Sequence, residues 1–264
     1  MQNVLNLSFK PRNLQGILPW RFHRPYGKQR EICFVLLAVK LQSRAPSRNQ
    51  SRPRVDPAIR SALQVAKGNI QTAPRATETR MSISIASATA EAAEVLRTAR
   101  IAEPRREAGS LLSHALGRDR GYALTHPNDP IPKPALESFQ AYVTRRAAGE
   151  PLQYITGHQE FFKLDFEVTP DVLIPRPETE MIVEVAMELL AEAAEPLIAD
   201  IGTGSGCIAI SLLHDLPHAR AVAGDISSAA LSVARRNAVR YDVIDRIVLI
   251  ESDCFSAVPA EPPF

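Results

Sequence analysis

One acidic residue followed by three closely spaced glycines is the feature of this 264-residue chain best suited to chemistry. Asp200 lies in a short apolar run that predicts a buried strand, and a five-residue turn follows it: Gly202, Thr203, Gly204, Ser205 and Gly206. Glycines in such a turn let the backbone approach a ligand, because any Cβ would fill the ligand's space. An apolar helix, expected to begin near Ser205, would point its unpaired N–H groups and positive dipole end at the same place. The pattern indicates a site for a nucleotide-like cofactor.

The spacing of the glycines distinguishes between cofactors. A dinucleotide fingerprint reads G-x-G-x-x-G, but here the third glycine, Gly206, comes one residue early. The sequence Asp200-x-Gly202-x-Gly204-x-Gly206 resembles motif I of the S-adenosylmethionine-dependent methyltransferases. The alternative is a glycine-rich strand-to-helix turn that binds no ligand.

Two later acids favour cofactor binding. Residues 219–225 predict a second strand that ends in Asp225, which could accept hydrogen bonds from both ribose hydroxyls or cap the helix that follows. Residues 246–251 predict a third strand, after which Asp253 would suit the adenine amino group and Cys254 the adenine ring. We expect Asp200, Asp225 and Asp253 to lie in register at the ends of three parallel strands.

Charge separates an N-terminal extension from the rest of the chain. Residues 1–80 hold 15 Lys or Arg and 3 Asp or Glu, whereas the remaining residues hold 16 and 26. We expect the extension to be disordered, and it has three interpretations: a targeting presequence, a basic arm for nucleic acid, or sequence read through upstream of a true start at Met81. Because the remainder is acidic, nucleic-acid binding is not expected outside residues 1–80.

Cysteine usage and hydropathy exclude several classes of protein. Cys33, Cys207 and Cys254 lack metal-ligand spacing, so we expect no metal, no disulfide framework and a cytoplasmic location. Small buried apolar side chains are the expected role of Cys207 and Cys254. The apolar run at 32–39 is too short to cross a membrane.

Two regions precede the predicted sheet. Helical periodicity dominates residues 81–150, where Pro104 suits a helix start and Gly117 and Gly149 suit helix ends, so we expect a small helical bundle. Alternating apolar residues within 151–175 predict a β-hairpin linker. Residues 176–264 would then form an α/β domain, in which Arg176 is held between two prolines and Glu178 lies near a helix start.

Four sequence blocks together resemble the HemK/PrmC family of peptide chain release factor N5-glutamine methyltransferases. They occur in the family's order: 149–155 (GEPLQYI), 157–161 (GHQEF), 173–180 (LIPRPETE) and 200–206 (DIGTGSG). The resemblance covers the chain from about Met81 onward. It implies a Rossmann-like class I methyltransferase fold and methylation of the glutamine of a Gly-Gly-Gln motif. It also implies that Asp200, segment 202–206, Asp225, Asp253 and Cys254 bind S-adenosylmethionine. The helical region would contact release factors. Arg176 and Glu178 are expected to serve either the substrate or the structure, and a surface salt bridge with Glu178 or Glu180 is the alternative role of Arg176.

The sequence departs from this family near its end. The family carries Asn-Pro-Pro-Tyr after the fourth strand, where it would hold the acceptor amide, and that tetrapeptide does not occur here. We expect the catalytic motif to lie beyond Phe264, so that no residue of this chain is predicted to be catalytic. The chain would then be truncated and inactive, with an incomplete sheet and an open edge at its first strand, although the complete enzyme would be a monomer.

Other functions stay open on the sequence alone. They are methylation of a ribosomal-protein glutamine, methylation of DNA adenine, and non-catalytic binding of the cofactor or the release factor.

Overall fold

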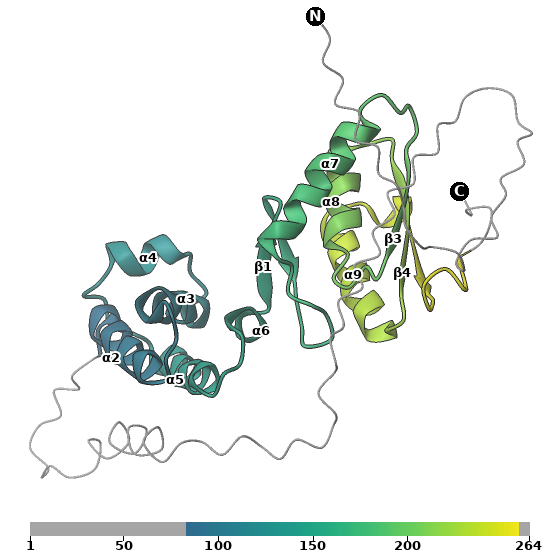
Figure 1. Cartoon of the computed structure of the whole chain (residues 1–264). Coiled ribbons are helices and arrows are strands. Elements are labelled where there is room, and N and C mark those ends of the chain that lie inside the picture. The colour runs from purple at the N-terminus through teal and green to yellow at the C-terminus, as the bar shows by residue number, and fades with distance from the viewer. Residues whose placement is uncertain (1–82, 259–264) are drawn as a thin grey trace, which may run out of the picture. The chain divides into compact units, whose positions relative to one another are not determined.

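A computed structural model describes residues 83–258 of the chain (Figure 1). The predicted basic extension, with Cys33 and Met81, lies outside the described residues. Residues 259–264 also lie outside them, so the expectation of a break at Phe264, before the catalytic motif, stays a prediction. Within residues 83–258 no helix is long and apolar enough to cross a membrane.

Short amphipathic helices form the first described region, as their periodicity predicts. The helices are α2 (Ile85–Thr98), α3 (Pro104–Leu116), α4 (Arg120–Thr125), α5 (Lys133–Ala147) and α6 (Leu152–Thr156). Pro104 is the first residue of α3, and Gly117 ends that helix in the left-handed conformation at φ 62°. Leu96, Leu111 and Phe139 bring the apolar faces of α2, α3 and α5 into one core. The single turn α6 was not predicted, because five residues are too few to show a helical period.

A two-stranded hairpin follows the helices. Strand β1 (His158–Phe161) pairs antiparallel with β2 (Leu164–Glu167). The turn between them places Phe162 and Lys163 at positive φ, 49° and 63°. Phe161 and Phe166 are buried and belong to the same apolar cluster as the sheet that follows, so the hairpin packs on that sheet's helices.

Three parallel strands form the sheet, in the order β3-β4-β5, and each lies where the sequence predicts a strand. Their bounds are β3 (Leu197–Ile201), β4 (Arg220–Asp225) and β5 (Ile247–Glu251). The register aligns Asp200 with Ala223 and Asp225 with Glu251. Strand β3 is an edge of the described sheet, and the parallel order agrees with the Rossmann-like α/β fold that was expected.

The helices of this region lie on one face of the sheet (Figure 1). They are α7 (Glu180–Leu190), which extends the short helix η1 (Pro177–Thr179), then α8 (Cys207–Asp215) and α9 (Ser228–Arg240); the turn η2 (Ile244–Arg246) leads into β5. Parallel strands joined by helices require right-handed crossovers. Because the order β3-β4-β5 advances in one direction, both crossover helices fall on the same side. Because the three strands are parallel, their carboxyl ends meet at one edge of the sheet. In open α/β sheets, ligands bind at this edge.

Candidate cofactor site

The glycine loop joins β3 to α8 at the carboxyl edge of the sheet. Its glycines adopt positive φ, 83° at Gly202, 56° at Gly204 and 81° at Gly206, a conformation that side chains with a Cβ rarely adopt. The helix after the loop begins at Cys207, two residues later than the sequence predicts, because Gly206 is the left-handed residue that precedes it.

The three glycines differ in what surrounds them. A Cβ added to Gly202 or Gly204 would meet no atom within 4 Å, whereas one added to Gly206 would lie 2.7 Å from Ile210 Cδ1 and 3.3 Å from Ala234 Cβ. A side chain at position 206 would therefore crowd Ala234 of α9 and would also have to adopt a left-handed backbone at φ 81°. Gly202 and Gly204 border open space, as a backbone that admits a ligand must.

Neighbouring groups at the end of β4 hold the loop in place. The backbone N–H groups of Gly202 and Thr203 both donate to the carbonyl oxygen of Gly224, at 2.8 and 3.0 Å. The N–H of Gly204 donates to Asp225 Oδ2 at 2.9 Å. These three amides are already paired, so this part of the loop shapes the site through its backbone conformation and offers no free N–H group.

Asp200 has an internal role. Its side chain is 3% exposed, and Oδ2 accepts hydrogen bonds from Thr203 Oγ1 at 2.8 Å and from the Ala209 backbone N–H at 3.3 Å. Ala209 lies in the first turn of α8, whose cap Gly206 has no side chain, so Asp200 supplies the missing cap from the preceding strand. Burial raises the pKa of Asp200, and the two hydrogen bonds oppose that rise.

Asp225 is the acid that faces the loop. It is partly buried, and its carboxylate accepts the N–H of Gly204 with one oxygen and the N–H of Ser227 with the other, at 3.0 Å. Ser227 in turn caps α9 by accepting the N–H of Ala230. A carboxylate offers about four lone-pair positions, so two remain for ribose hydroxyls.

The turn after β5 supplies the outer side of the site. Ser252 is buried: its N–H donates to the carbonyl oxygen of Asp225 at 2.9 Å, and its hydroxyl donates to the carbonyl oxygen of Cys254 at 2.9 Å. Asp253 and Cys254 are both exposed. The prediction that Cys254 is a buried apolar side chain is wrong, because this turn buries only its first residue.

The three acids do not lie in register, which corrects a second expectation. Asp200 aligns with Ala223, two residues before Asp225, and Asp253 lies two residues beyond Glu251, the partner of Asp225. The stagger places Asp200 inside the protein, Asp225 at the rim and Asp253 in solvent. Among these three acids, Asp225 alone contacts the loop from the open side.

Arg176 and Glu178 lie before α7 and are both exposed. Within residues 83–258 no hydrogen bond or ion pair joins either side chain to the glycine loop, and Arg176 forms no ion pair with Glu178 or Glu180. The carboxylate of Glu180 instead accepts the N–H of Phe162 at 2.9 Å. The predicted substrate role of Arg176 and Glu178 stays a prediction.

Cys207 is buried, as predicted. Burial raises the pKa of its thiol to about 12, so the thiol stays protonated. In the described part of the chain, no group of three or more His, Cys, Asp or Glu side chains is arranged to hold a metal ion.

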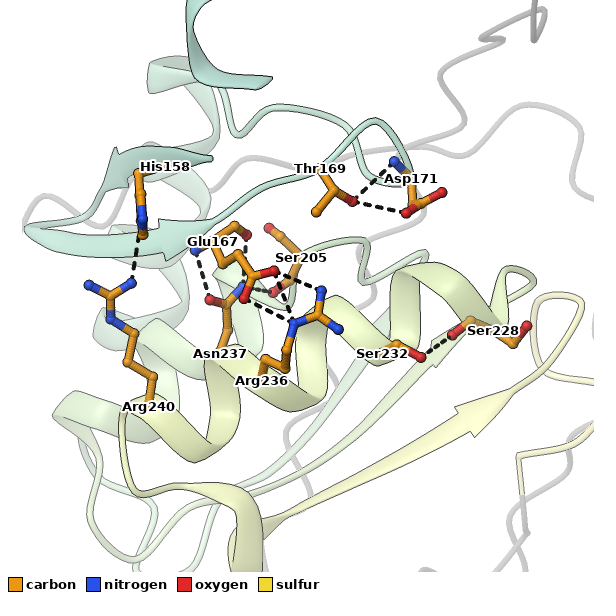
Figure 2. A network of polar contacts seen from close by, with 10 residues as sticks. All are labelled: His158, Glu167, Thr169, Asp171, Ser205, Ser228, Ser232, Arg236, Asn237 and Arg240. Carbon is orange, nitrogen blue, oxygen red and sulfur yellow. Dashed lines mark hydrogen bonds and ion pairs between the residues drawn. The ribbon is translucent and has the colours of Figure 1, made fainter. Parts of the chain in front are cut away.

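Sequence reasoning missed Asn237, which binds the loop through the carbonyl oxygen of Ser205 at 2.9 Å (Figure 2). The buried residues of α9 are Ala230, Val233, Ala234, Asn237 and Ala238, so Asn237 belongs to an apolar stripe. A polar residue on the buried face of an amphipathic helix is the signal that could have identified it.

Two families match the chain in tandem. The PrmC N-terminal domain matches residues 87–157, and the methyltransferase small domain matches residues 179–262. These ranges correspond to the helices before the hairpin and to the α/β region with the glycine loop.

Curated relatives share substantial identity with this chain. A release factor glutamine methyltransferase of Moorella thermoacetica is 43% identical over 190 residues, which are 69% of this chain and 67% of the relative. Proteins with the same name from Burkholderia pseudomallei and Bordetella pertussis are 48% and 45% identical, over 56% and 60% of this chain. The chain spans 52% and 58% of those two relatives.

Proposed function

The chain belongs to the release factor glutamine methyltransferase family, and from this premise we propose that it serves S-adenosylmethionine-dependent methylation of a glutamine side-chain amide in peptide chain release factors. The methyl donor of this family is S-adenosylmethionine. When bound, it would supply a methyl group to the amide nitrogen of the acceptor by in-line displacement: the S–CH3 bond would break, S-adenosylhomocysteine would leave and the amide would lose one proton. The relatives favour release factors over ribosomal proteins or DNA as the methyl acceptor.

The glycine loop and its contact with Asp225 are the observation that supports this proposal most directly. Open space at Gly202 and Gly204 admits a ligand to the backbone, and the two free acceptor positions of Asp225 suit the ribose hydroxyls. Asp253 and Cys254, exposed after β5, would border the adenine. Asp200 would act indirectly, by fixing Thr203 and the start of α8.

The acceptor side of the reaction depends on residues that the site does not include. The Asn-Pro-Pro-Tyr sequence implied for holding the glutamine amide does not occur between Met1 and Phe264. For this chain the proposal therefore concerns cofactor binding by residues 176–264 and contact with the release factor by residues 81–150. We place the reaction in the cytoplasm, where release factors act.

Calorimetric titration tests the cofactor assignment on the 264-residue chain. We expect saturable binding of S-adenosylmethionine at one site, and no competition by NAD. Failure to bind S-adenosylmethionine, or displacement by a nicotinamide coenzyme, would overturn the assignment. A binding assay with purified release factor, a ribosomal protein and duplex DNA in parallel tests the acceptor class: binding of release factor alone is expected.

A further inference from the structure

Asn237 joins the β-hairpin to the glycine loop through one buried amide (Figure 2). Its Oδ1 accepts the N–H of Glu167 at 2.8 Å, and its Nδ2 donates to the carbonyl oxygens of Glu167 at 3.0 Å and Ser205 at 2.9 Å. Both hydrogens of the amide nitrogen are therefore used, one on strand β2 and one on the loop. The side chain is 0% exposed, so water cannot replace either partner without a rearrangement.

On the hairpin side, α9 takes the place of a neighbouring strand. One turn after Asn237, the Tyr241 hydroxyl accepts the N–H of Asp165 at 2.6 Å and donates to its carbonyl oxygen at 2.7 Å. Positions 237 and 241 are separated by about 6 Å along a helix, and positions 165 and 167 by about 6.6 Å along a strand. The two spacings agree closely enough for Asn237 of α9 and Tyr241, the C-cap residue of α9, to satisfy the backbone of β2 that faces away from β1.

On the loop side, Asn237 supplies a contact that the sheet does not. The other loop hydrogen bonds to neighbouring groups run to the sheet: the N–H groups of Gly202, Thr203 and Gly204 donate to the end of β4, and the Thr203 hydroxyl donates to Asp200 in β3. Ser205 is bound from the opposite direction, through α9. The position of its carbonyl therefore depends on the same side chain that holds Glu167.

We propose that Asn237 is a positioning residue for the cofactor loop, which holds the Ser205 carbonyl in place through its own hydrogen bond. This inference rests on the proposed function, because it matters for activity only if the loop binds S-adenosylmethionine. It makes the hairpin, which follows the helices matched to the PrmC N-terminal domain, part of the support for the cofactor site.

The surrounding chain offers matched controls. The Tyr241 hydroxyl contacts the same strand, at the backbone N–H and carbonyl oxygen of Asp165. Arg236 binds the Glu167 carboxylate through Nε at 3.0 Å and Nη2 at 2.7 Å. In the part of the chain that the structure describes, neither side chain forms a hydrogen bond with the loop. Tyr241→Phe and Arg236→Ala therefore weaken the hairpin contact and leave the Ser205 hydrogen bond in place.

The test compares S-adenosylmethionine affinity with stability in the full chain. Asn237→Asp keeps an acceptor for the Glu167 N–H but loses both donated hydrogen bonds. If the Asn237→Asp variant does not fold, Asn237→Ser replaces it in the test. We expect the Asn237 variants to weaken binding about tenfold or more, the effect of a buried partner left unpaired. Tyr241→Phe and Arg236→Ala should stay within about twofold of the unmodified chain, even where Tyr241→Phe lowers the unfolding temperature comparably.

A second measurement separates this inference from the proposed function. Amide hydrogen exchange across residues 200–210 should become faster in the Asn237 variants and remain unchanged in Tyr241→Phe, whether or not S-adenosylmethionine binds. If the unmodified chain fails to bind the cofactor, the proposed function fails and the exchange data alone decide the inference. The inference would be overturned if the Asn237 variants showed unchanged cofactor affinity and unchanged amide exchange. It would also be overturned if Tyr241→Phe, at matched stability, lost as much cofactor affinity as the Asn237 variants.

Discussion

The buried carboxylate of Asp200 accepts a hydrogen bond from the Thr203 hydroxyl at 2.8 Å. The same carboxylate caps α8 by accepting a hydrogen bond from the backbone N–H of Ala209. An acid that the sequence places at a cofactor site thus uses its hydrogen bonds on the backbone and side chains that form the site. This separation between residues that shape the loop and residues that face it determines what each substitution should do.

Asp200→Asn should change the pH dependence of stability. Because burial raises the pKa of Asp200 above its ordinary 3.8, the folded state binds the proton more tightly than the unfolded state. The free energy of unfolding of the unmodified chain should therefore fall as pH rises from about 4 through the raised pKa. The fall amounts to about 1.4 kcal/mol for each pH unit that separates the folded-state pKa from the unfolded-state pKa. The Asn side chain keeps an acceptor and does not titrate, so the variant should gain stability relative to the unmodified chain over that range.

Urea unfolding at several pH values between about 3.5 and 7 measures this difference. Asp200→Ala is the control: it removes the acceptor and should be less stable at every pH, by about 1–3 kcal/mol. A difference between Asp200→Asn and the unmodified chain that does not vary with pH would contradict the explanation.

Asp225→Ala should affect cofactor binding most strongly among the acids. It removes the acceptor for Gly204 and Ser227 together with the positions available to the ribose hydroxyls. Hydrogen bonds to a charged group contribute about 1.5–3 kcal/mol each, so loss of two should weaken S-adenosylmethionine binding about 100-fold or more. Calorimetric titration measures the effect. Asp253→Asn, in the exposed turn after β5, is the control and should cost about tenfold at most; an equal or larger loss there would reverse the assignment of the two acids.

Gly204→Ala and Gly206→Ala should separate binding from folding. A methyl group at Gly206 would require a strained backbone at φ 81° and would lie 3.3 Å from Ala234 Cβ, so this variant should lose about 1–3 kcal/mol of stability. A methyl group at Gly204 meets no protein atom but projects into the open space beside the loop, at a φ of 56°. It should therefore reduce cofactor affinity more than its effect on stability explains. Thermal unfolding together with S-adenosylmethionine titration distinguishes the two, and identical behaviour of the two variants is the contrary outcome.

Self-association of the 264-residue chain is a further expectation. Strand β3 is an edge of the described sheet, and α7 exposes an apolar row of Met181, Val185 and Leu189, which are 63%, 49% and 61% exposed. Unpaired strand edges and exposed apolar faces favour association. Light scattering after size exclusion should show species larger than a monomer, and Val185→Glu, which leaves the buried face of α7 intact, should reduce them. A monomer with one cooperative unfolding transition would show that these surfaces are protected.

The sequence predicted the elements of this fold well because its signals are local. Alternating glycines after an apolar run predicted the loop between β3 and α8, and strand-length apolar runs predicted β4 and β5. Helix periodicity with Pro104 and Gly117 predicted α3 almost to the residue. The family, too, could be identified from blocks of contiguous residues, and the matches at 87–157 and 179–262 agree with it.

Tertiary structure decided how the polar residues are used. Strand ends alone suggested three acids in register, but the pairing of β3, β4 and β5 makes Asp200 internal, Asp225 adjacent to the loop and Asp253 exposed. Asn237 is 32 positions from Ser205 and 70 from Glu167, so no local pattern could pair them.

The sequence by itself determined which backbone forms the cofactor loop, since a glycine's conformational freedom is a property of the residue. Which side chains hold that loop became visible only once α9 was packed between the hairpin and the sheet. A hydrogen bond between distant residues exists only when the fold brings donor and acceptor within reach.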